Sequence, residues 1–277
     1  MKIEFGGPYR ITQTGTGDVM LYNPNDQYVG RSFDHYRQFS EGELRFLLAG
    51  TASDHTVLDI GANIGAFTIP LARAAKRVIA IEPQRLVFQM LAANLALNGI
   101  WNVLALHSAA GAIDGQSVIV PPLDPMGKQN FGALEIDPAA KTGGEKVGSV
   151  TVDGLGLGPV HLMKVDVEGM ERDVLMGARG TIMEHKPALY LENDRDDKSA
   201  DLIRTVEEMG YVAYWHLPPL YSPQNPAGNA ENLFQGIVSV NMICWHKDNV
   251  PEFAEKIASH RVTGPEDRWA RFIGTTV

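Results

Sequence analysis

The feature that most constrains this chain is a short apolar run, Thr56 to Ile60, that leads directly into the small-residue turn GANIGAF and then into a helical pattern. A second apolar run, Arg77 to Ile81, follows, and an acid, Glu82, stands directly after it. Strand-length apolar runs that alternate with helical periods are typical of βαβ units around a parallel sheet. The chain is therefore predicted to be an α/β protein with a doubly wound, Rossmann-like sheet.

The same alternation continues along the chain. Further strands are expected at Val103 to His107, Val160 to Val165, Ala188 to Leu191, Tyr211 to Trp215 and Gly236 to Cys244. The expected helices span Glu41 to Leu48, Ile64 to Ala75, Gln84 to Leu97, Gly169 to Ala178 and Ser199 to Met209. Gln116 to Val120 and Gly132 to Ile136 flank a loop that contains Pro and Gly, and they are predicted to form a small antiparallel insertion, followed by a polar segment from Pro138 to Gly148.

We expect one globular unit with extensions. Residues 1–50 would form an N-terminal cap with extended segments at Tyr9 to Gln13 and Val19 to Tyr22, and residues 51–247 the doubly wound domain, with the insertion at about 116–147. Residues 248–277 would form a helical tail with a helix from Pro251 to Ser259.

Composition limits the class of protein. With 277 residues, of which 44% are apolar, the chain can bury a substantial core. Its net charge of -9 makes nucleic acid an unlikely partner, because it repels phosphate backbones. No stretch approaches the ~20 apolar residues that cross a bilayer, so no membrane span is expected. Cys244 is the single cysteine and the start MKIEFGGPYR does not resemble a targeting signal, so a cytoplasmic location is expected.

A binding site is predicted where the first two strands end, since ligands of open parallel sheets bind beyond the carboxyl ends of the strands. Asp59, Gly61, Asn63 and Gly65 form a small-residue loop that lets backbone amides approach a ligand, and Asp59 can lie near a cationic group. Glu82 stands at the position, ~20 residues past a glycine turn, where an acid commonly binds a ribose diol. A ligand that contains a nucleoside is therefore expected.

The later strand ends add mostly acids. Ser108, Ala109 and Ala110 are small and could line an adenine slot on position alone. The fourth and fifth strands are followed by Asp166, Glu168, Glu171, Glu192, Asn193 and Asp194. A dinucleotide needs donors for its pyrophosphate, and the GxGxxG turn that supplies them is absent. This acidic rim favours S-adenosylmethionine, which has no phosphate and carries a sulfonium cation.

The segments VLDIGANIGAFTIPLA, AIEPQ, NLALN, MKVDVEGMERDVLMGA and KPALYLEND together closely resemble the FkbM-type family of class I S-adenosylmethionine-dependent methyltransferases. The similarity covers roughly Phe39 to Trp245. It implies a Rossmann-like methyltransferase domain and O-methylation of a hydroxyl on a sugar or a secondary metabolite, with a polyketide or a lipid-linked glycan among the acceptors considered.

The resemblance also implies roles for particular residues. Asp59, Gly61, Asn63 and Gly65 would form the cofactor loop, and Glu82 would hold the ribose. Asp166 would lie beside the methionine part of the cofactor, and Glu168 at the mouth of the acceptor pocket. Glu41, in the stretch QFSEGE, resembles the acidic segment of the family that folds over the cofactor. The N-terminal residues, the insertion and the tail match the family poorly, so acceptor specificity is expected to reside there.

Methyl transfer to a hydroxyl calls for positioning and for a base. Glu168 and Glu192 are the candidate bases, and His216 is an alternative because it follows the YVAYW strand. Each has a structural interpretation as well. Glu168 and Glu171 would stand in the first turn of a helix, where carboxylates are favourable regardless of catalysis. Glu192 and Asn193 could cap the approach to the next helix, and His216 could be a surface histidine.

A metal site is weighed separately. Asp166 with Glu192 and Asn193 resembles the placement of magnesium ligands in catechol O-methyltransferases, and oxygen ligands suit a hard cation. Oxygen-rich loops at strand ends are common without metal, so Mg²⁺ is allowed but not expected, and no metal ligand is assigned. The histidines and Cys244 show no zinc spacing.

Two other classes of function remain as alternatives. One is a non-catalytic binding protein with the adenosylmethionine fold, and the less favoured one is a dinucleotide-dependent oxidoreductase. The sequence leaves open the acceptor, O- against N-methylation and the oligomeric state, with a homodimer allowed.

Overall fold

The centre of the protein is a seven-stranded sheet. The computed structural model describes residues 2–4, 7–132 and 142–268, and the strand order of this sheet is β12-β13-β11-β10-β4-β5-β6. The strands are β4 (Thr56–Ile60), β5 (Arg77–Ile81), β6 (Val103–Leu106), β10 (Leu162–Val165), β11 (Ala188–Glu192), β12 (Tyr211–His216) and β13 (Asn241–His246). Neighbouring strands from β6 to β11 pair in parallel, whereas β13 runs antiparallel to both of its neighbours.

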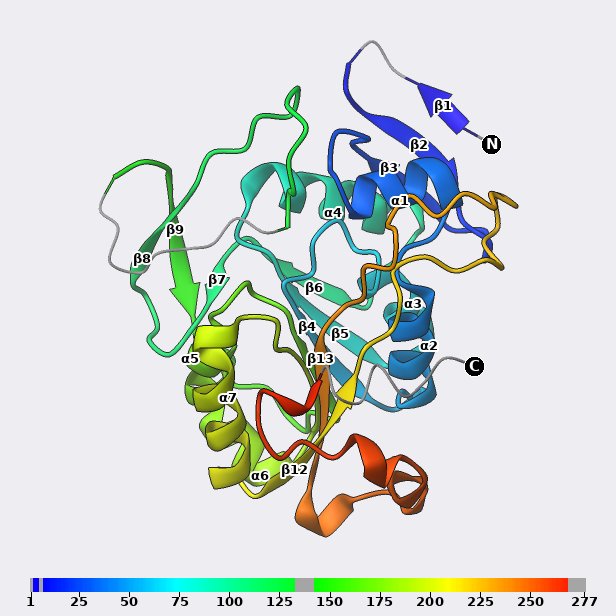
Figure 1. Ribbon diagram of the computed structural model, residues 1–277. Coiled ribbons are helices and arrows are strands. Elements are labelled where there is room, and N and C mark those ends of the chain that lie inside the picture. Colours follow the sequence, from blue (N-terminus) through cyan, green and yellow to red (C-terminus); the bar gives the residue numbers. More distant parts are fainter. Residues whose placement is uncertain (1, 5–6, 133–141, 269–277) are drawn as a thin grey trace.

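Helices cover both faces of this sheet (Figure 1). On one face lie α2 (Glu41–Ala49), α3 (Thr68–Ala74) and α4 (Arg85–Leu97), and on the other lie α5 (Glu171–Gly177), α6 (Arg179–His185) and α7 (Asp196–Glu208). Alternate residues of each strand enter opposite cores: Leu58 packs in the cluster of α5 to α7, and Val57 in that of α2 and α3. This arrangement confirms the predicted doubly wound, Rossmann-like α/β fold.

Some helix boundaries differ from the predicted ones. The segment expected to be helical from Ile64 begins its helix only at Thr68, because the glycine turn extends through Gly65, which has a positive φ of 91°. The helix expected at Gly169 to Ala178 is α5, and it is followed directly by α6, which was not expected. The short helix α1 (Val29–Tyr36) in the N-terminal segment was also missed.

The inserted sheet is built differently from the predicted one. It contains β7 (Ala109–Ala110), β8 (Ser117–Val120) and β9 (Glu145–Val150), with β9 in the middle. The antiparallel partner of β8 is thus β9, which begins within the segment Pro138 to Gly148, where only a polar segment was expected. Val147 and Ser149 of β9 are buried while Lys146 and Gly148 are exposed, the alternation of a half-buried strand. Of the predicted strand Gly132 to Ile136, all but Gly132 lies outside the described residues.

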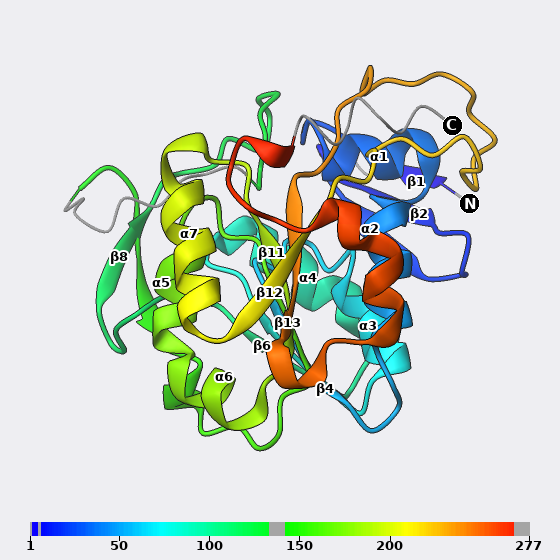
Figure 2. The ribbon, with the colours of Figure 1, turned by 60° about the horizontal axis from the view of Figure 1, so that its bottom comes forward.

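The C-terminal segment packs across the end strands of the sheet (Figure 2). Residues expected to form an α-helix form the 3-10 helix η3 (Glu252–His260), with a kink at Ile257. It lies against β12, with Phe253 edge-on to Trp245 of β13. Among the residues described, no helix combines the length and the apolar character that a bilayer span requires.

The N-terminal segment is joined to the domain by asparagines. It forms a three-stranded antiparallel sheet of β1 (Lys2–Glu4), β2 (Arg10–Gln13) and β3 (Val19–Tyr22). Asn94 of α4 and Asn98, which caps the end of this helix, each accept from and donate to the backbone of β3, at Leu21 and Val19 respectively. The four donor to acceptor distances lie between 2.6 and 3.0 Å. These side-chain amides thus form hydrogen bonds with the edge of β3 that the backbone of another strand would otherwise form.

We predict that Asn94→Ala lowers the free energy of unfolding by about 2–3 kcal/mol, because Asn94 is fully buried and its loss leaves the backbone groups of Leu21 and Ile64 without partners. Urea unfolding measures this change. Gln89→Ala, at an exposed position of the same helix, is the control and should change the stability little. Equal midpoints for the two variants would contradict the assigned role of Asn94.

Candidate active site

A cleft opens beyond the carboxyl ends of β4, β5, β10 and β11. It has a volume of about 340 Å³ and is continuous with a narrower slot of about 50 Å³ through shared lining residues, among them Gly61, Glu82 and Glu168. The wider part is lined from the strand ends and from the segments that cover them: Tyr28, Phe39, Glu43, Asn63, Phe67, Lys164, Asp166, Glu192, Arg195, Ser239 and Asn241. The position agrees with the predicted edge of the sheet.

The loop after β4 packs tightly against the loop after β10. Gly61 has a φ of 78°, and a Cβ atom there would lie 1.7 Å from the backbone oxygen of Asp166. Any other residue would therefore force the two loops apart. Asn63, also at a positive φ of 50°, accepts a hydrogen bond from the N–H of Ile64 through its Oδ1. The loop is thus held with its backbone facing the cleft.

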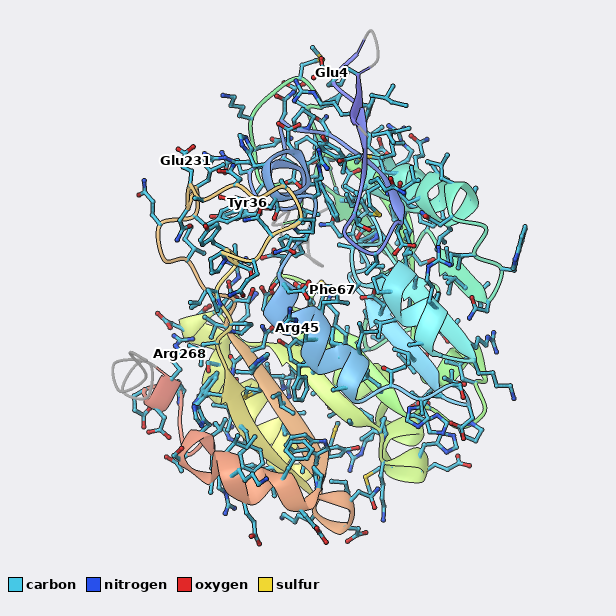
Figure 3. The ribbon with its side chains drawn as sticks, turned by 90° about the vertical axis from the view of Figure 1, so that its right-hand side faces the viewer. Glu4, Tyr36, Arg45, Phe67, Glu231 and Arg268 are labelled. Carbon is cyan, nitrogen blue, oxygen red and sulfur yellow. The ribbon has the colours of Figure 1, made fainter. Side chains whose placement is uncertain are left out.

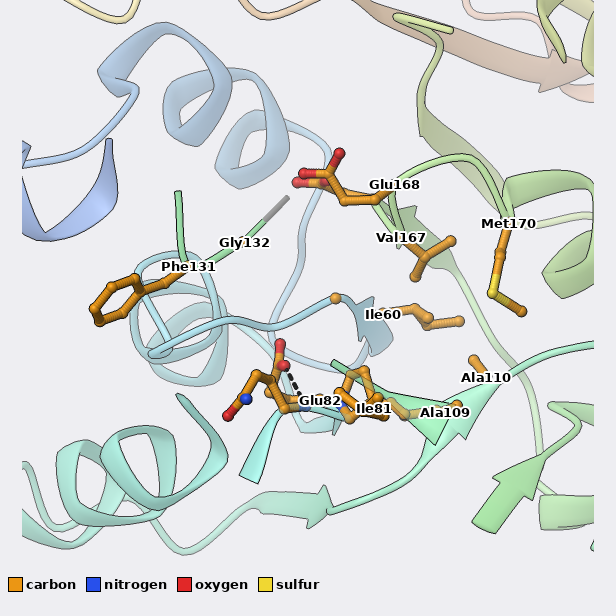
Figure 4. A pocket seen from close by; sticks show the side chains of 15 residues that line it. Ile60, Ile81, Glu82, Ala109, Ala110, Phe131, Gly132, Val167, Glu168 and Met170 are labelled. Carbon is orange, nitrogen blue, oxygen red and sulfur yellow. Dashed lines mark hydrogen bonds between the residues drawn. The ribbon is translucent and has the colours of Figure 1, made fainter. Parts of the chain in front are cut away.

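Glu82 stands between the cleft and the slot. Its two carboxylate oxygens accept from the backbone N–H groups of Asn63 at 2.9 Å and of Gln84 at 2.8 Å. Burial raises the pKa of Glu82 to about 7, although these two donors oppose the shift. Figure 4 shows the carboxylate facing the slot opposite Glu168. Glu82 can therefore accept further hydrogen bonds from a diol placed in the slot.

The slot is narrow, and its lining suits a flat apolar ring. Its walls are mostly apolar and are formed by Ile60, Ile81, Ala109, Ala110, Val167 and Met170, with Phe131 farther out (Figure 4). Ala109 and Ala110 line it as expected, and Ser108 does not belong to the lining of either part.

Beneath the cleft lies a buried ion cluster that sequence reasoning missed. The side chain of Lys164, on β10, is only 2% exposed, and its Nζ lies 3.2 Å from Asp166, 3.5 Å from Asp59 and 3.3 Å from the carbonyl of Gly61. Burial lowers the pKa of this ammonium, but the carboxylates of Asp166, Asp59 and Glu43 outweigh burial and raise it. Lys164 therefore stays charged.

This cluster changes the place of Asp59. Its side chain is fully buried, does not line the cleft, and accepts from the hydroxyl of Thr68 at 2.6 Å. Burial raises its pKa, and Lys164 opposes the shift. The ring of Phe67 lies over the ammonium, with 5.3 Å between Nζ and the ring centroid, and Figure 3 shows Phe67 beside α2 near the middle of the molecule. Asp59 thus supports the loop from below.

Three acids meet at the rim. Oxygens of Asp166, Glu168 and Glu192 all lie within 4.8 Å of one another. Burial and the neighbouring Asp166 raise the pKa of Glu168 to about 8, and the same causes raise that of Glu192 well above its usual range. Arg195 forms an ion pair with Glu168. Two of these acids are therefore poised to carry a proton, or to face a cation, near neutral pH.

Other predicted acids have structural roles. Glu171 accepts from the backbone N–H groups of Val167 and Gly169, as expected of an acid at the start of a helix. Asn193, considered as a metal ligand, turns away from the rim acids, and its side-chain amide lies 3.3 Å from the sulfur of Met242. The group of oxygen-bearing side chains at the rim therefore consists of Asp166, Glu168 and Glu192, and Asn193 does not belong to it.

On α2 the structure places Glu43, and not Glu41, at the cleft. Glu41 pairs with Arg45 at 2.8 Å and lines a different cavity. Glu43 is buried, and it accepts from Ser40, from Ser239 at 2.6 Å and from Asn241 at 3.2 Å. Glu43 lies four residues before the buried Leu47 and so on the same face of the helix, which is the signal in the sequence that could have identified it.

His216 lies behind the cleft. It does not belong to the cleft lining, and its ring packs against Phe46, with 5.2 Å between the centroids. Nδ1 lies 2.8 Å from the hydroxyl of Tyr190, which in turn donates to Glu43 at 3.4 Å. Burial lowers the pKa of His216 to about 4, so it is neutral at physiological pH. Its position allows it to act on the cleft only through Tyr190 and Glu43.

The model described as the methyltransferase FkbM domain matches residues 59–213, more than half of the chain. The chain belongs to this family. The resemblance seen in the sequence motifs is thereby confirmed.

Individual relatives match over shorter stretches. The methyltransferase sdnD of Sordaria araneosa is 31% identical over 162 residues, which are 47% of this chain and 62% of that protein. A probable ribosomal RNA small subunit methyltransferase A of Methanosphaera stadtmanae is 33% identical over 66 residues, 24% of each chain. The crystal structure of a methyltransferase FkbM from Methylobacillus flagellatus has 20% identity and a TM-score of 0.46, and the match covers 69% of this chain and 44% of that one. The matches thus span less than two thirds of these relatives.

The ion cluster of this FkbM domain gives a stability prediction. We expect Lys164→Met to lower the free energy of unfolding by about 3–5 kcal/mol at pH 8, because Asp59 would keep a buried charge without a counter-ion. Burial raises the folded-state pKa of Asp59, so the penalty should shrink as the pH falls through that value and the carboxyl takes up a proton. Denaturant unfolding at pH 5 and pH 8 measures both effects.

The matched control is Lys146→Met, at an exposed position of β9. It should leave stability nearly unchanged at both pH values. A Lys164→Met protein as stable as the control at pH 8 would show that the ammonium does not hold the cluster together.

Proposed function

We propose that the protein is an S-adenosylmethionine-dependent methyltransferase that methylates a hydroxyl of a sugar or secondary-metabolite acceptor. The observation that carries the proposal is the order of groups along one cavity. An apolar slot, the carboxylate of Glu82 and the acids of the rim follow one another in the order that adenine, ribose and a cationic sulfonium would need. Membership of the FkbM family supports the same reaction class.

The residues fit the cofactor part by part. Ala109, Ala110 and Met170 would enclose the adenine, and Glu82 would accept from the ribose hydroxyls. Gly61 and Asn63 would bring backbone groups to the methionine part, with Asp166 opposite its ammonium. Bound S-adenosylmethionine supplies a methyl group already activated on a sulfonium. The chain then has to place an acceptor oxygen in line with that methyl group and remove its proton.

Glu168 is the base in this proposal. It lines both the slot and the wider cleft, so an acceptor in the cleft can reach it. Its pKa of about 8 lets it take a proton from a hydroxyl as the O–CH₃ bond forms and the S–CH₃ bond breaks. Glu192, with a more strongly raised pKa, would remain protonated and could donate to the acceptor. His216 is assigned no direct role, because it lies behind Tyr190.

The proposal assigns no divalent cation to the rim acids. Arg195 pairs with Glu168 and Lys164 pairs with Asp166, and a bound sulfonium would add a further positive charge. Of the functions considered besides methyl transfer, neither a binding protein nor a dinucleotide enzyme is favoured by a specific contact.

The cofactor assignment predicts micromolar binding of S-adenosylmethionine and S-adenosylhomocysteine in calorimetry, and no comparable binding of NAD. Glu82→Gln should weaken the binding of S-adenosylhomocysteine at least about tenfold, or 1.4 kcal/mol. The amide has one acceptor oxygen where the carboxylate has two, and both backbone N–H groups and the ribose need acceptors there. Glu207→Gln, exposed on α7, should bind as the wild type does. If neither sulfur nucleoside binds, the proposed function is wrong.

The role of Glu168 predicts a pH profile. The carboxylate must be unprotonated to accept a proton, so kcat/KM should fall about tenfold per unit as the pH drops below about 8. A bound sulfonium stabilises the ionised form of Glu168 and lowers its pKa. The fall in kcat should therefore occur at lower pH than the fall in kcat/KM. Label transfer to any hydroxylated acceptor that a panel identifies measures the profile.

Glu168→Gln should lower kcat by about 10²–10⁴-fold and remove this limb, with the affinity for S-adenosylhomocysteine nearly unchanged. Glu184→Gln, exposed on α6, is the control. A Glu168→Gln protein that binds the cofactor and turns over at the wild-type rate would remove Glu168 from the role of base.

A further inference from the structure

A second cavity adjoins the cleft on the side of the N-terminal segment. It has a volume of about 200 Å³, and it shares Phe39 and Ala66 with the lining of the cleft. The Phe39 ring, which packs on Phe67 at 5.8 Å between centroids, thus stands as a partition between the two spaces. Of the predicted site residues, only Glu41 lines this cavity, and no proposed cofactor position accounts for it.

Apolar side chains form most of its wall. They come from β3, α1, α2 and α3, and they are Met20, Phe33, Leu44, Ile69 and Pro70 in addition to Phe39. These side chains suit an apolar body, whereas Thr14, Thr16 and Gln38 add polar groups to the same lining.

Two acids and one arginine line this cavity, and the two acids are already paired with other arginines. Asp18 is paired with Arg73 at 2.6 Å and accepts from Thr16, and Glu41 is paired with Arg45 at 2.8 Å. Arg37 also lines the cavity, and the described residues offer its guanidinium no carboxylate or hydrogen-bond acceptor. An arginine without an acid partner beside apolar side chains favours an anionic ligand.

The far wall comes from a distant part of the chain. Gln224 and Pro226, in the loop between β12 and β13, complete the lining. This loop is fixed on α1 by Tyr36, whose hydroxyl donates to the carbonyl of Glu231 and accepts from the N–H of Leu233, both at 2.8 Å. Figure 3 shows Tyr36 and Glu231 close together on this side of the molecule. The cavity is therefore part of the folded structure.

We propose that this second cavity binds the apolar body and the carboxylate end of the methyl acceptor, with the carboxylate on Arg37. The hydroxyl end of the same acceptor would pass Phe39 into the cleft. The inference deepens the proposed function and rests on it for the identity of the ligand as an acceptor. The binding chemistry of the cavity can be tested separately from methyl transfer.

The first test uses octanoate, 1-octanol and octylammonium as probes, in calorimetry on the full chain saturated with S-adenosylhomocysteine. Octanoate should bind at least tenfold more tightly than the other two. Arg37→Gln should raise its Kd about tenfold or more and leave the Kd of 1-octanol unchanged. Arg31→Gln removes the same charge from α1 at a position outside the lining, and it should bind octanoate as the wild type does.

Octanoate that binds no better than 1-octanol, or that binds Arg37→Gln as tightly as wild type, overturns the proposal. The second test compares ω-hydroxy fatty acids with their methyl esters in label transfer. The acids should have at least tenfold lower KM, and Arg37→Gln should abolish that difference with kcat nearly unchanged. Equal KM values for acids and esters in the wild type overturn the acceptor assignment. Failure to bind S-adenosylhomocysteine would instead count against the proposed function.

Discussion

The ammonium of Lys164 lies below the cleft, within 3.5 Å of oxygens of Asp59, Asp166 and Gly61, and these groups belong to two neighbouring strands and the loop between sheet and helix. The loops after β4 and β10 come so close at Gly61 that no side chain fits between them. Without the cation, carboxylates from both strand ends would face one another in a poorly hydrated space. The positions of Gly61 and Asp166, and so the floor of the cleft, depend on this one charge.

The N-terminal segment is held by a different kind of contact. Glu43 binds groups of β13 and of the loop before it, and Asn94 binds the backbone of β3. These contacts are directional, so they fix the position of the cap more narrowly than apolar packing alone would. A consequence is that the walls of the cleft contributed by Tyr28 and Phe39 are placed by polar side chains, of which Glu43 itself lines the cleft.

The sequence predicts the rim well and the cap poorly, for physical reasons. Carboxyl ends of parallel strands share one edge, so Glu82, Asp166, Glu168 and Glu192 could be brought together from strand order alone. Which acid of QFSEGE faces inward depends on the rotation of α2, and only the spacing to the buried Leu47 indicates it. The strand β9 has a short alternation interrupted by glycine, so its pattern is weak. The place of His216 depends on an antiparallel register with β13 that the motifs do not encode.

Charge conservation connects the buried cluster with the proposed chemistry. In the proposed reaction the sulfonium loses its positive charge as the methyl group leaves, and the acceptor proton moves to Glu168. One positive charge is thereby replaced by another a short distance away, next to Asp166 and Glu192. The acids of the rim therefore face nearly the same total charge before and after transfer, and little reorganisation of their surroundings is required. A rim of neighbouring acids with one readily protonated member suits this exchange better than a single strongly ionised carboxylate would, because the proton remains among the same carboxylates that the cation had faced.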